Sequence, residues 1–159
     1  MPEIELRTLG EVPQHLIAGL KHRFWSRSEP VALHELNGEA FVMRQPGSQT
    51  RAWTDVLFAQ HHIQPRIVAE FDNPAAIKRL VEQSAALAIF PQYVIDSELK
   101  EGHLRIVPLQ QPLSRTLRVV WHNLEPISLQ AEAFIQHVTI QAAKGLFGAS
   151  APAGEAGKP

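Results

Sequence analysis

Polar side chains at the start of one expected helix are the first candidates for chemistry. Gly47, Ser48 and Thr50 follow a short apolar run and stand where a helix is predicted to begin. Free backbone N–H groups and the positive end of the helix dipole attract a carboxylate or another anion, and the two hydroxyls add donors. Ser48 also has a purely structural role as the N-cap of that helix. Both roles stay open at this point.

A second candidate group follows an expected strand. Phe71, Asp72 and Asn73 lie at its carboxyl end, which is the edge where open α/β sheets bind ligands. Asn73 offers an amide donor to a ligand oxygen, or it caps the next helix. Asp72 disfavours an anionic ligand unless Arg51 or Arg115 offsets its charge.

Metal and hydrolytic chemistry find little support in the residue pattern. His61 and His62 are adjacent, so on a helix they point to different faces and chelate one ion poorly. Ser48, these histidines and Asp72 have the composition of a catalytic triad, but no G-x-S-x-G turn accompanies them. The chain has no cysteine, which excludes thiolate metal sites. We therefore expect no enzyme activity, no metal and no cofactor.

The composition predicts a folded domain that does not hold nucleic acid by itself. Hydrophobic residues make up 45% of the 159 residues, and the formal net charge of -1 lacks the basic excess of a compact nucleic-acid binder. No apolar run reaches membrane-spanning length, and the N-terminus lacks a basic-then-apolar leader. A cytoplasmic protein without membrane contact is the expectation.

Alternating apolar patterns predict an α/β sandwich with a largely parallel sheet. A strand starting near Ile4 should break at Gly10. The apolar residues that follow have the spacing of a helix that runs to about Lys21: Val12, Leu16, Ile17 and Leu20. Residues 22–35 are expected to form a connector with at most a helical turn near its end. Further strands are expected at 40–43, 66–71, 86–90, 104–108 and 117–121, with helices after Ser48, from Asn73, over 92–99 and after Ser128.

Four stretches of the chain, in order and at the right spacing, resemble the effector-binding domain of LysR-type transcriptional regulators. They are LNGEAFVMRQPGSQTR at 36–51, FDNPAAIKRLV at 71–81, the segment 84–104, and the segment 113–134. The first contains the family's Gly-Ser-x-Thr-Arg helix start, whereas Ser84 and Ala86 stand where the family usually has glycines. The resemblance implies a periplasmic-binding-protein-like (type II) three-layer sandwich, in which two α/β subdomains flank an effector cleft.

The resemblance also implies a division of the chain. Residues 37–115 match a complete second subdomain, while the first subdomain is partial. Its parts are a remnant with a connector at 1–36, in which 3–21 resemble a strand and a helix, and a return strand with the C-terminal helix at 116–146. A disordered tail is expected at 147–159. Because a sheet that lacks central strands leaves backbone groups unpaired, we expect the first subdomain to be rebuilt around fewer strands, paired with a partner chain or poorly ordered.

The function that follows from the resemblance is ligand sensing. The chain is expected to bind a small polar or carboxylate-bearing metabolite, an organic acid or another anion, without a DNA-binding domain of its own. The effector-binding residues are expected to be Gly47, Ser48, Thr50, Phe71, Asp72 and Asn73. Relatives assemble through these domains, so a homo-oligomer such as a homodimer is expected. The alternative is a truncated, non-sensing interaction fragment that pairs with full-length regulators.

Overall fold

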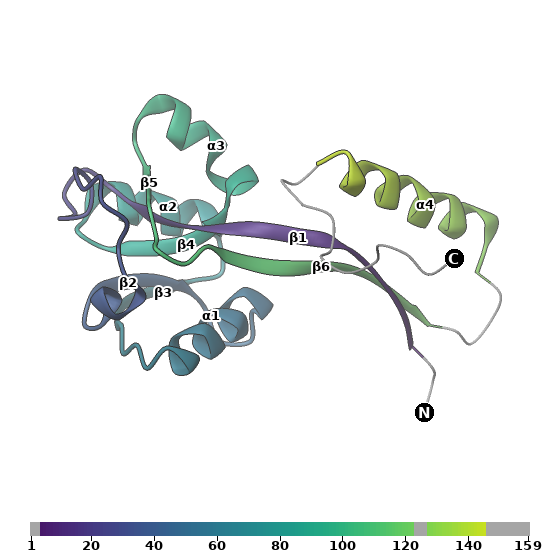
Figure 1. The fold of residues 1–159 in the computed structure, drawn as a ribbon, viewed down its shortest axis with the longest axis horizontal. Helices are drawn as coiled ribbons and strands as arrows, with labels where there is room; N and C mark the ends of the chain where they lie inside the picture. The colour runs from purple at the N-terminus through teal and green to yellow at the C-terminus, as the bar shows by residue number, and fades with distance from the viewer. Residues whose placement is uncertain (1–3, 123–126, 146–159) are drawn as a thin grey trace. The chain divides into compact units, whose positions relative to one another are not determined.

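The computed structural model describes residues 4–122 and 127–145, which fall into two compact units. The central unit is the continuous segment Gln14–Pro112, and the terminal unit combines Met1–Pro13 with Leu113–Pro159. The strands are β1 Ile4–Ala18, β2 Ala40–Arg44, β3 Arg66–Phe71, β4 Leu87–Pro91, β5 Arg105–Val107 and β6 Leu113–His122 (Figure 1). The helices are the 3-10 turn η1 Leu33–Leu36 and the α-helices α1 Gln49–Gln60, α2 Pro74–Gln83, α3 Gln92–Glu101 and α4 Leu129–Ala143.

The central unit is built on a mixed sheet with the strand order β3-β2-β4-β1-β5. β2 runs parallel to β3 and β4, whereas the end of β1 runs antiparallel to β4 and β5, with Leu16 opposite both Ile89 and Val107. The expectation of a largely parallel sheet is therefore wrong for this side of the sheet. It failed because the segment that supplies the antiparallel strand was predicted to be a helix.

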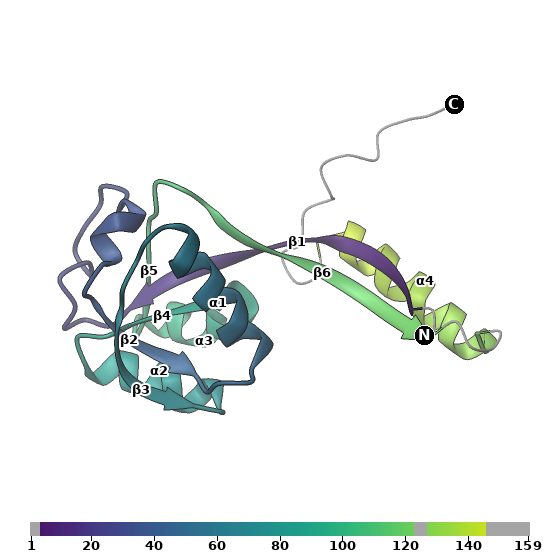
Figure 2. The ribbon, with the colours of Figure 1, turned by 90° about the horizontal axis from the view of Figure 1, so that it is seen from below.

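Helices cover both faces of this sheet. Phe41 points toward α1, where its ring meets that of Phe58 at 5.1 Å between centroids in an edge-on arrangement. Its neighbour Val42 points to the opposite face and joins the core cluster that contains Ile77 of α2 and Ile95 of α3. Figures 1 and 2 show α1 on one side of β2 and β4, with α2 and α3 on the other. The central unit is thus a three-layer sandwich, as predicted.

The strand β1 is the largest departure from the sequence-based expectation. It continues through Gly10 and replaces the helix predicted from Val12 to Lys21. Apolar residues four positions apart fit a helical repeat and a two-residue strand repeat equally well, and burial shows that the strand repeat applies. Every second residue from Val12 is buried: Val12, Gln14, Leu16 and Ala18. Pro13 is exposed on the opposite face, a position that a strand tolerates and a helix interior does not.

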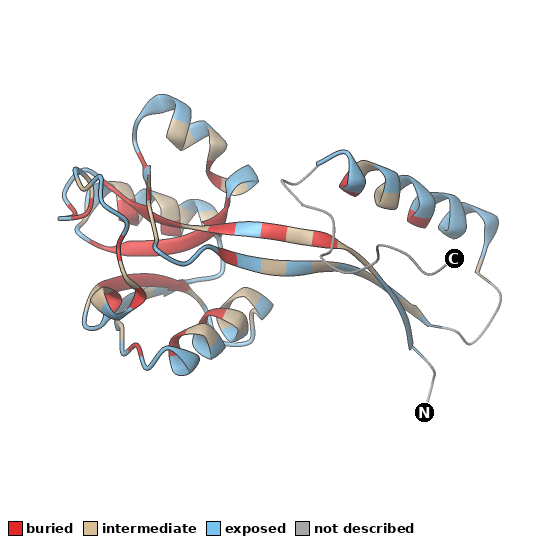
Figure 3. Cartoon of the chain, viewed as in Figure 1, coloured by how far each residue is buried: buried red, intermediate tan, exposed pale blue. Residues whose placement is uncertain are grey.

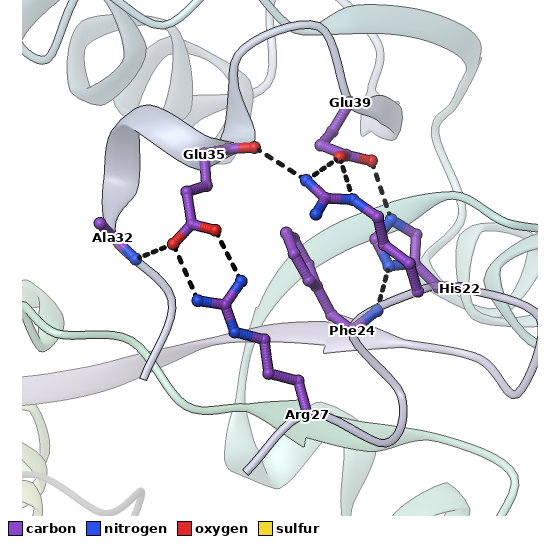
Figure 4. Close-up of polar contacts among 7 residues, drawn as sticks. His22, Phe24, Arg27, Ala32, Glu35 and Glu39 are labelled. Atoms are coloured by element: carbon purple, nitrogen blue, oxygen red, sulfur yellow. Dashed lines mark hydrogen bonds and ion pairs between the residues drawn. The ribbon is translucent and has the colours of Figure 1, made fainter. Parts of the chain in front are cut away.

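The segment between β1 and β2 is held by charged side chains around Phe24 (Figure 4). Arg27 donates two hydrogen bonds to the carboxylate of Glu35, at 2.6 and 3.1 Å, and its guanidinium carbon lies 5.6 Å from the Phe24 ring centroid. The Glu35 carboxylate also accepts from the Ala32 N–H at 3.0 Å. The Arg27 hydrogen bonds and this backbone donor lower the pKa of Glu35 to about 2. The predicted connector, with its helical turn at Leu33–Leu36, is confirmed.

His22 anchors the other half of this connector. Its Nδ1 accepts from the Phe24 N–H at 3.0 Å, so the imidazole proton is assigned to Nε2, which lies 3.1 Å from the Glu39 carboxylate. Arg23 donates to the same carboxylate at 2.7 Å. Burial lowers the pKa of His22, and Glu39 works against that shift. The fold therefore holds this histidine in its neutral form.

The terminal unit contains few buried side chains. In it β6 pairs with β1, and the Glu11 carboxylate accepts hydrogen bonds from Ser114 at 3.0 Å and Thr116 at 2.6 Å. Ser128 caps α4 as predicted, because its hydroxyl accepts from the Ala131 N–H at 3.2 Å. Most of α4 is exposed (Figure 3), and Ile135 and Ala142 are its buried residues. The expected tail at 147–159 lies outside the described residues.

None of the helices in the described part of the chain combines the length and the apolar character that crossing a bilayer requires.

Candidate functional site

The two helix starts singled out in the sequence lie at one edge of the central unit's sheet. β2 and β3 are parallel neighbours, with Arg44 opposite Phe71 at their carboxyl ends. The backbone N–H of Gln45 donates to the Phe71 carbonyl at 3.0 Å, which holds the two strand ends together. The turns that contain Gly47 and Asn73 therefore leave neighbouring strands at a shared carboxyl edge, the edge at which such sheets bind ligands.

Two of the predicted site residues act as helix caps. The Ser48 hydroxyl accepts from the Thr50 N–H at 3.2 Å at the start of α1, and the Asn73 side-chain oxygen accepts from the Ala75 N–H at 2.8 Å at the start of α2. Gly47 has a φ of 91°, a backbone conformation that glycine adopts without strain. The structural roles of Ser48 and Asn73 are confirmed. Their roles in ligand binding stay predictions.

A hollow of about 290 Å³, counted to its open mouth, lies beside these turns. Most of this volume is open solvent at the mouth, so the enclosed space is far smaller than the roughly 300–1,000 Å³ of a typical small-molecule site. Residues from β2, α1, α2 and β4 line it: Phe41, Val42, Met43, Arg44, Thr50, Arg51, Thr54, Ile77, Ala88, Ile89 and Phe90. Of the six predicted site residues, all of which the structure describes, Thr50 alone is among them. Phe71, Asp72 and Asn73 are exposed outside this hollow.

Arg51 holds the polar side of the hollow together. Its Nε donates to the Asp55 carboxylate at 2.9 Å, and one terminal nitrogen donates to the Arg44 carbonyl at 3.0 Å. The same terminal nitrogen pairs with the Glu70 carboxylate, so one side chain links α1 to β2 and β3. The Glu70 hydrogen bond, followed by that of Asp55, raises the pKa of Arg51. Because Asp55 and Glu70 already neutralise its charge, Arg51 does not offset Asp72 and does not attract an anion.

Arg44 is the cation of the hollow that no carboxylate neutralises within the described part of the chain. Its Nε is buried and has no hydrogen-bond partner there. Thr54 lies nearby on α1, where its hydroxyl donates to the Thr50 carbonyl at 2.8 Å. Sequence reasoning passed over Arg44 and Thr54. Arg44 ends the strand before the Gly47 turn, so the rule that drew attention to Phe71 at the end of β3 would also have found it.

Hydrolytic and metal chemistry have no support in the geometry. Ser48 precedes α1 and His61 follows it, and a helix of 12 residues is about 18 Å long. The two side chains are therefore too far apart for proton transfer. No group of three or more histidine, aspartate or glutamate side chains within residues 4–122 and 127–145 is placed to hold a metal ion.

Comparison with protein families gives one match over most of the chain. The family model described as LysR substrate binding domain matches residues 1–143. A RuBisCO operon transcriptional regulator of Acidithiobacillus ferrooxidans is 26% identical over 163 residues, which cover 93% of this chain and 52% of the regulator. The HTH-type transcriptional activator CmpR of Synechocystis is 23% identical over 86% of this chain and 45% of its own length. The chain thus spans about half the length of the curated relatives it matches.

Solved structures show the same fold. The regulatory domain of CcmR from Synechocystis, in complex with 2-PG, matches with a TM-score of 0.80 at 23% identity, over 96% of this chain and 70% of that domain. The effector binding domain of QuiR, in complex with shikimate, matches with a TM-score of 0.75 at 20% identity, over 89% of this chain and 66% of that domain. These matches confirm the predicted periplasmic-binding-protein-like type II fold. The matched proteins are transcriptional regulators and their regulatory domains.

Proposed function

The chain belongs to the LysR substrate-binding domain family, and from this premise we propose that it senses a small polar metabolite that carries a carboxylate. The observation that carries the proposal is the hollow at the carboxyl edge of β2, where Arg44, Thr50 and Thr54 stand over an apolar floor. A few polar groups on an apolar surface are the usual make-up of a site for a small molecule.

The two helix starts support the same location. Gly47, Ser48 and Thr50 begin α1, and Asn73 begins α2 at the neighbouring strand end. Helix N-termini carry partial positive charge, so an acid bound at this edge gains from both. In the proposal Gly47, Ser48, Thr50, Phe71, Asp72 and Asn73 form the effector-binding rim, with Thr50 reaching into the hollow itself.

Related domains bind small effectors. The CcmR regulatory domain was solved with 2-PG, and the QuiR effector binding domain was solved with shikimate. We propose by analogy that this chain takes a metabolite of similar size. Binding would act on transcription by favouring one arrangement of the regulator over another, which requires different affinities for the two states.

The setting of the protein is part of the same proposal. We place it in the cytoplasm, as a homo-oligomer or paired with a full-length regulator, and we expect no direct contact between this chain and nucleic acid. Its formal net charge of -1 agrees with that last expectation.

A second function is favoured by the terminal unit. Large apolar side chains are exposed there on β1, β6 and α4: Ile4, Leu6, Val120, Leu129, Phe134 and Ile140. Exposed apolar side chains that form a contiguous patch are typical of protein-contact surfaces. The alternative is therefore an interaction fragment that binds no metabolite and pairs with full-length regulators.

Thermal-shift screening against small organic acids separates the two functions. A sensor is stabilised by a bound acid according to RT ln(1 + [L]/Kd), which is about 2.7 kcal/mol at 100 times Kd. The expected result is a concentration-dependent rise in Tm with at least one acid. A well-folded sample that shows no rise with any acid, yet forms a complex with a full-length regulator, would contradict sensing and support the alternative.

A further inference from the structure

The hollow contains one arginine with a compensated charge and one without. Arg51 is paired with Asp55 and Glu70, whereas no carboxylate of the described residues pairs with Arg44. Arg44 is therefore the lining cation that a ligand anion can pair with, and one negative charge is enough to do so. A dianion would meet more repulsion from Asp55 and Glu70 than a monoanion does.

The Arg44 side chain has a donor that water does not satisfy. Its Nε is buried and without a partner, although the rest of the residue is only partly buried. Because Nε is enclosed by protein, a ligand in the hollow reaches Arg44 through its terminal nitrogens, where a ligand oxygen gains a charge-assisted hydrogen bond. Arginine donates through a planar fork whose geometry matches a carboxylate.

The other lining groups fit the remainder of such a ligand. The floor comes from Phe41 and Val42 of β2, Ile77 of α2 and Phe90 of β4, all apolar. The volume of about 290 Å³ is mostly open mouth, so the enclosed space takes little more than one small group such as a carboxylate, and the rest of a ligand would lie at the mouth. Thr54 already donates its proton to the Thr50 carbonyl, which leaves its oxygen as an acceptor toward the hollow.

We propose that Arg44 anchors the carboxylate of a monoanionic ligand in this hollow and so determines the charge of the metabolite that the chain accepts. This inference rests on the proposed sensing function and assigns its main polar contact. It differs from the sequence-based expectation, in which the backbone at Gly47 and Ser48 held the anion. The helix start then orients the ligand, and Arg44 supplies the charge.

The test is an NMR titration of the full chain with propionate. Inorganic phosphate serves as the more highly charged probe, and propionamide as a neutral probe of nearly the same shape. The variants are Arg44→Gln, Arg44→Lys and the control Arg66→Gln. Arg66 is exposed and opens β3, at the far end of the same parallel strand pair. Circular dichroism and Tm establish that each variant is folded.

The expected result is saturable propionate binding that shifts the amide signals of Thr50, Thr54 and the end of β4. Propionamide should bind at least tenfold more weakly, and phosphate more weakly than propionate. Arg44→Gln should lose about tenfold or more in affinity, Arg44→Lys should lose less, and Arg66→Gln should match the wild type.

Several results would overturn the inference, and they bear differently on the proposed function. Propionate binding at this edge that survives Arg44→Gln would remove Arg44 as the anchor and leave sensing intact. Tighter binding of phosphate would refute the preference for a monoanion. A wild-type chain that binds none of the probes and none of the acids in the thermal-shift screen would contradict both the inference and the sensing function.

Discussion

The central and terminal units differ in how far their side chains are buried. The central unit has a continuous core between its sheet and the helices on both faces, and residues such as Phe41, Leu87 and Val81 are almost fully enclosed. In the described part of the terminal unit the buried apolar residues are Val12, Leu113, Ile135 and Ala142. Both units expose large apolar side chains, so what distinguishes the central unit is its continuous core.

The difference indicates which unit can be stable without contacts to another polypeptide. A two-stranded ribbon with one helix buries too little to be stable alone, whereas a five-stranded sheet covered on both faces is sufficient. The hollow and both capped helix starts belong to the central unit. The proposed ligand site therefore lies in the self-sufficient unit, whereas the alternative function, pairing with another polypeptide, rests on the exposed unit.

Two phenylalanines give the sharpest comparison. Phe41 is 1% exposed in the central unit, and Phe134 is 61% exposed in the terminal unit. Phe41→Ala should lower the free energy of unfolding by about 3–5 kcal/mol, because it leaves a cavity in a packed core. Phe134→Ala should change it by about 0.5 kcal/mol or less. Urea denaturation measures both values, and equal losses in the two variants would abolish the distinction between the units.

Gly19 tests how tightly the central unit is packed. A Cβ at this position would lie 2.3 Å from the Val81 carbonyl oxygen of α2, a contact that neither backbone can accept unmoved. Gly19→Ala should cost about 1–3 kcal/mol through this overpacking. A variant as stable as the wild type in urea would show that β1 and α2 are separated more widely than the structure has them.

The helix caps extend the comparison to smaller effects. Asn73 caps α2 in the central unit, and Ser128 caps α4 in the terminal unit. Asn73→Ala should lower the stability of the whole central unit by about 1 kcal/mol, since α2 unfolds together with the core. Ser128→Ala should loosen α4 without changing the urea transition of the central unit. A shift of that transition in Ser128→Ala would mean that the two units unfold as one.

His22 gives the smallest expected effect and concerns pH. Because burial lowers its folded-state pKa below the ordinary value of about 6.5 for histidine, the fold favours the neutral form. Its contribution to stability is complete above about pH 6.5 and declines as the pH falls through the lower folded-state pKa. Urea titrations at pH 7.5 and pH 5 should show this loss in the wild type and a smaller loss in His22→Gln. If the wild type and His22→Gln lose the same stability between pH 7.5 and pH 5, His22 is not the cause of that loss.

Local signals allowed much of the central unit to be predicted from sequence. Asn73 and Ser48 precede apolar helical stripes, and their capping hydrogen bonds are present at 2.8 and 3.2 Å. The continuous apolar run of β4 predicted a strand buried on both faces, which all five of its residues confirm. These predictions succeeded because the signal and the structure involve the same few neighbouring residues.

Features that depend on distant pairing were not predictable in the same way. Leu16 fits a helix or a strand, and the choice is made by pairing with β4 and β5, which lie far along the chain. The hollow combines side chains of β2, α1, α2 and β4, so its lining cannot be read from any one segment. For this reason the sequence pointed to the edge that carries the hollow through Thr50, but it did not single out Arg44.

Hydrogen exchange of the full chain tests the contrast between the units most directly. The account predicts that amides of β2, β4 and the end of β1 exchange only through unfolding of the whole central unit. Amides of β6 and α4 should exchange at least a hundredfold faster, which corresponds to about 2.7 kcal/mol less protection. Equal protection in the two sets of amides would contradict the claim that the central unit alone is self-sufficient.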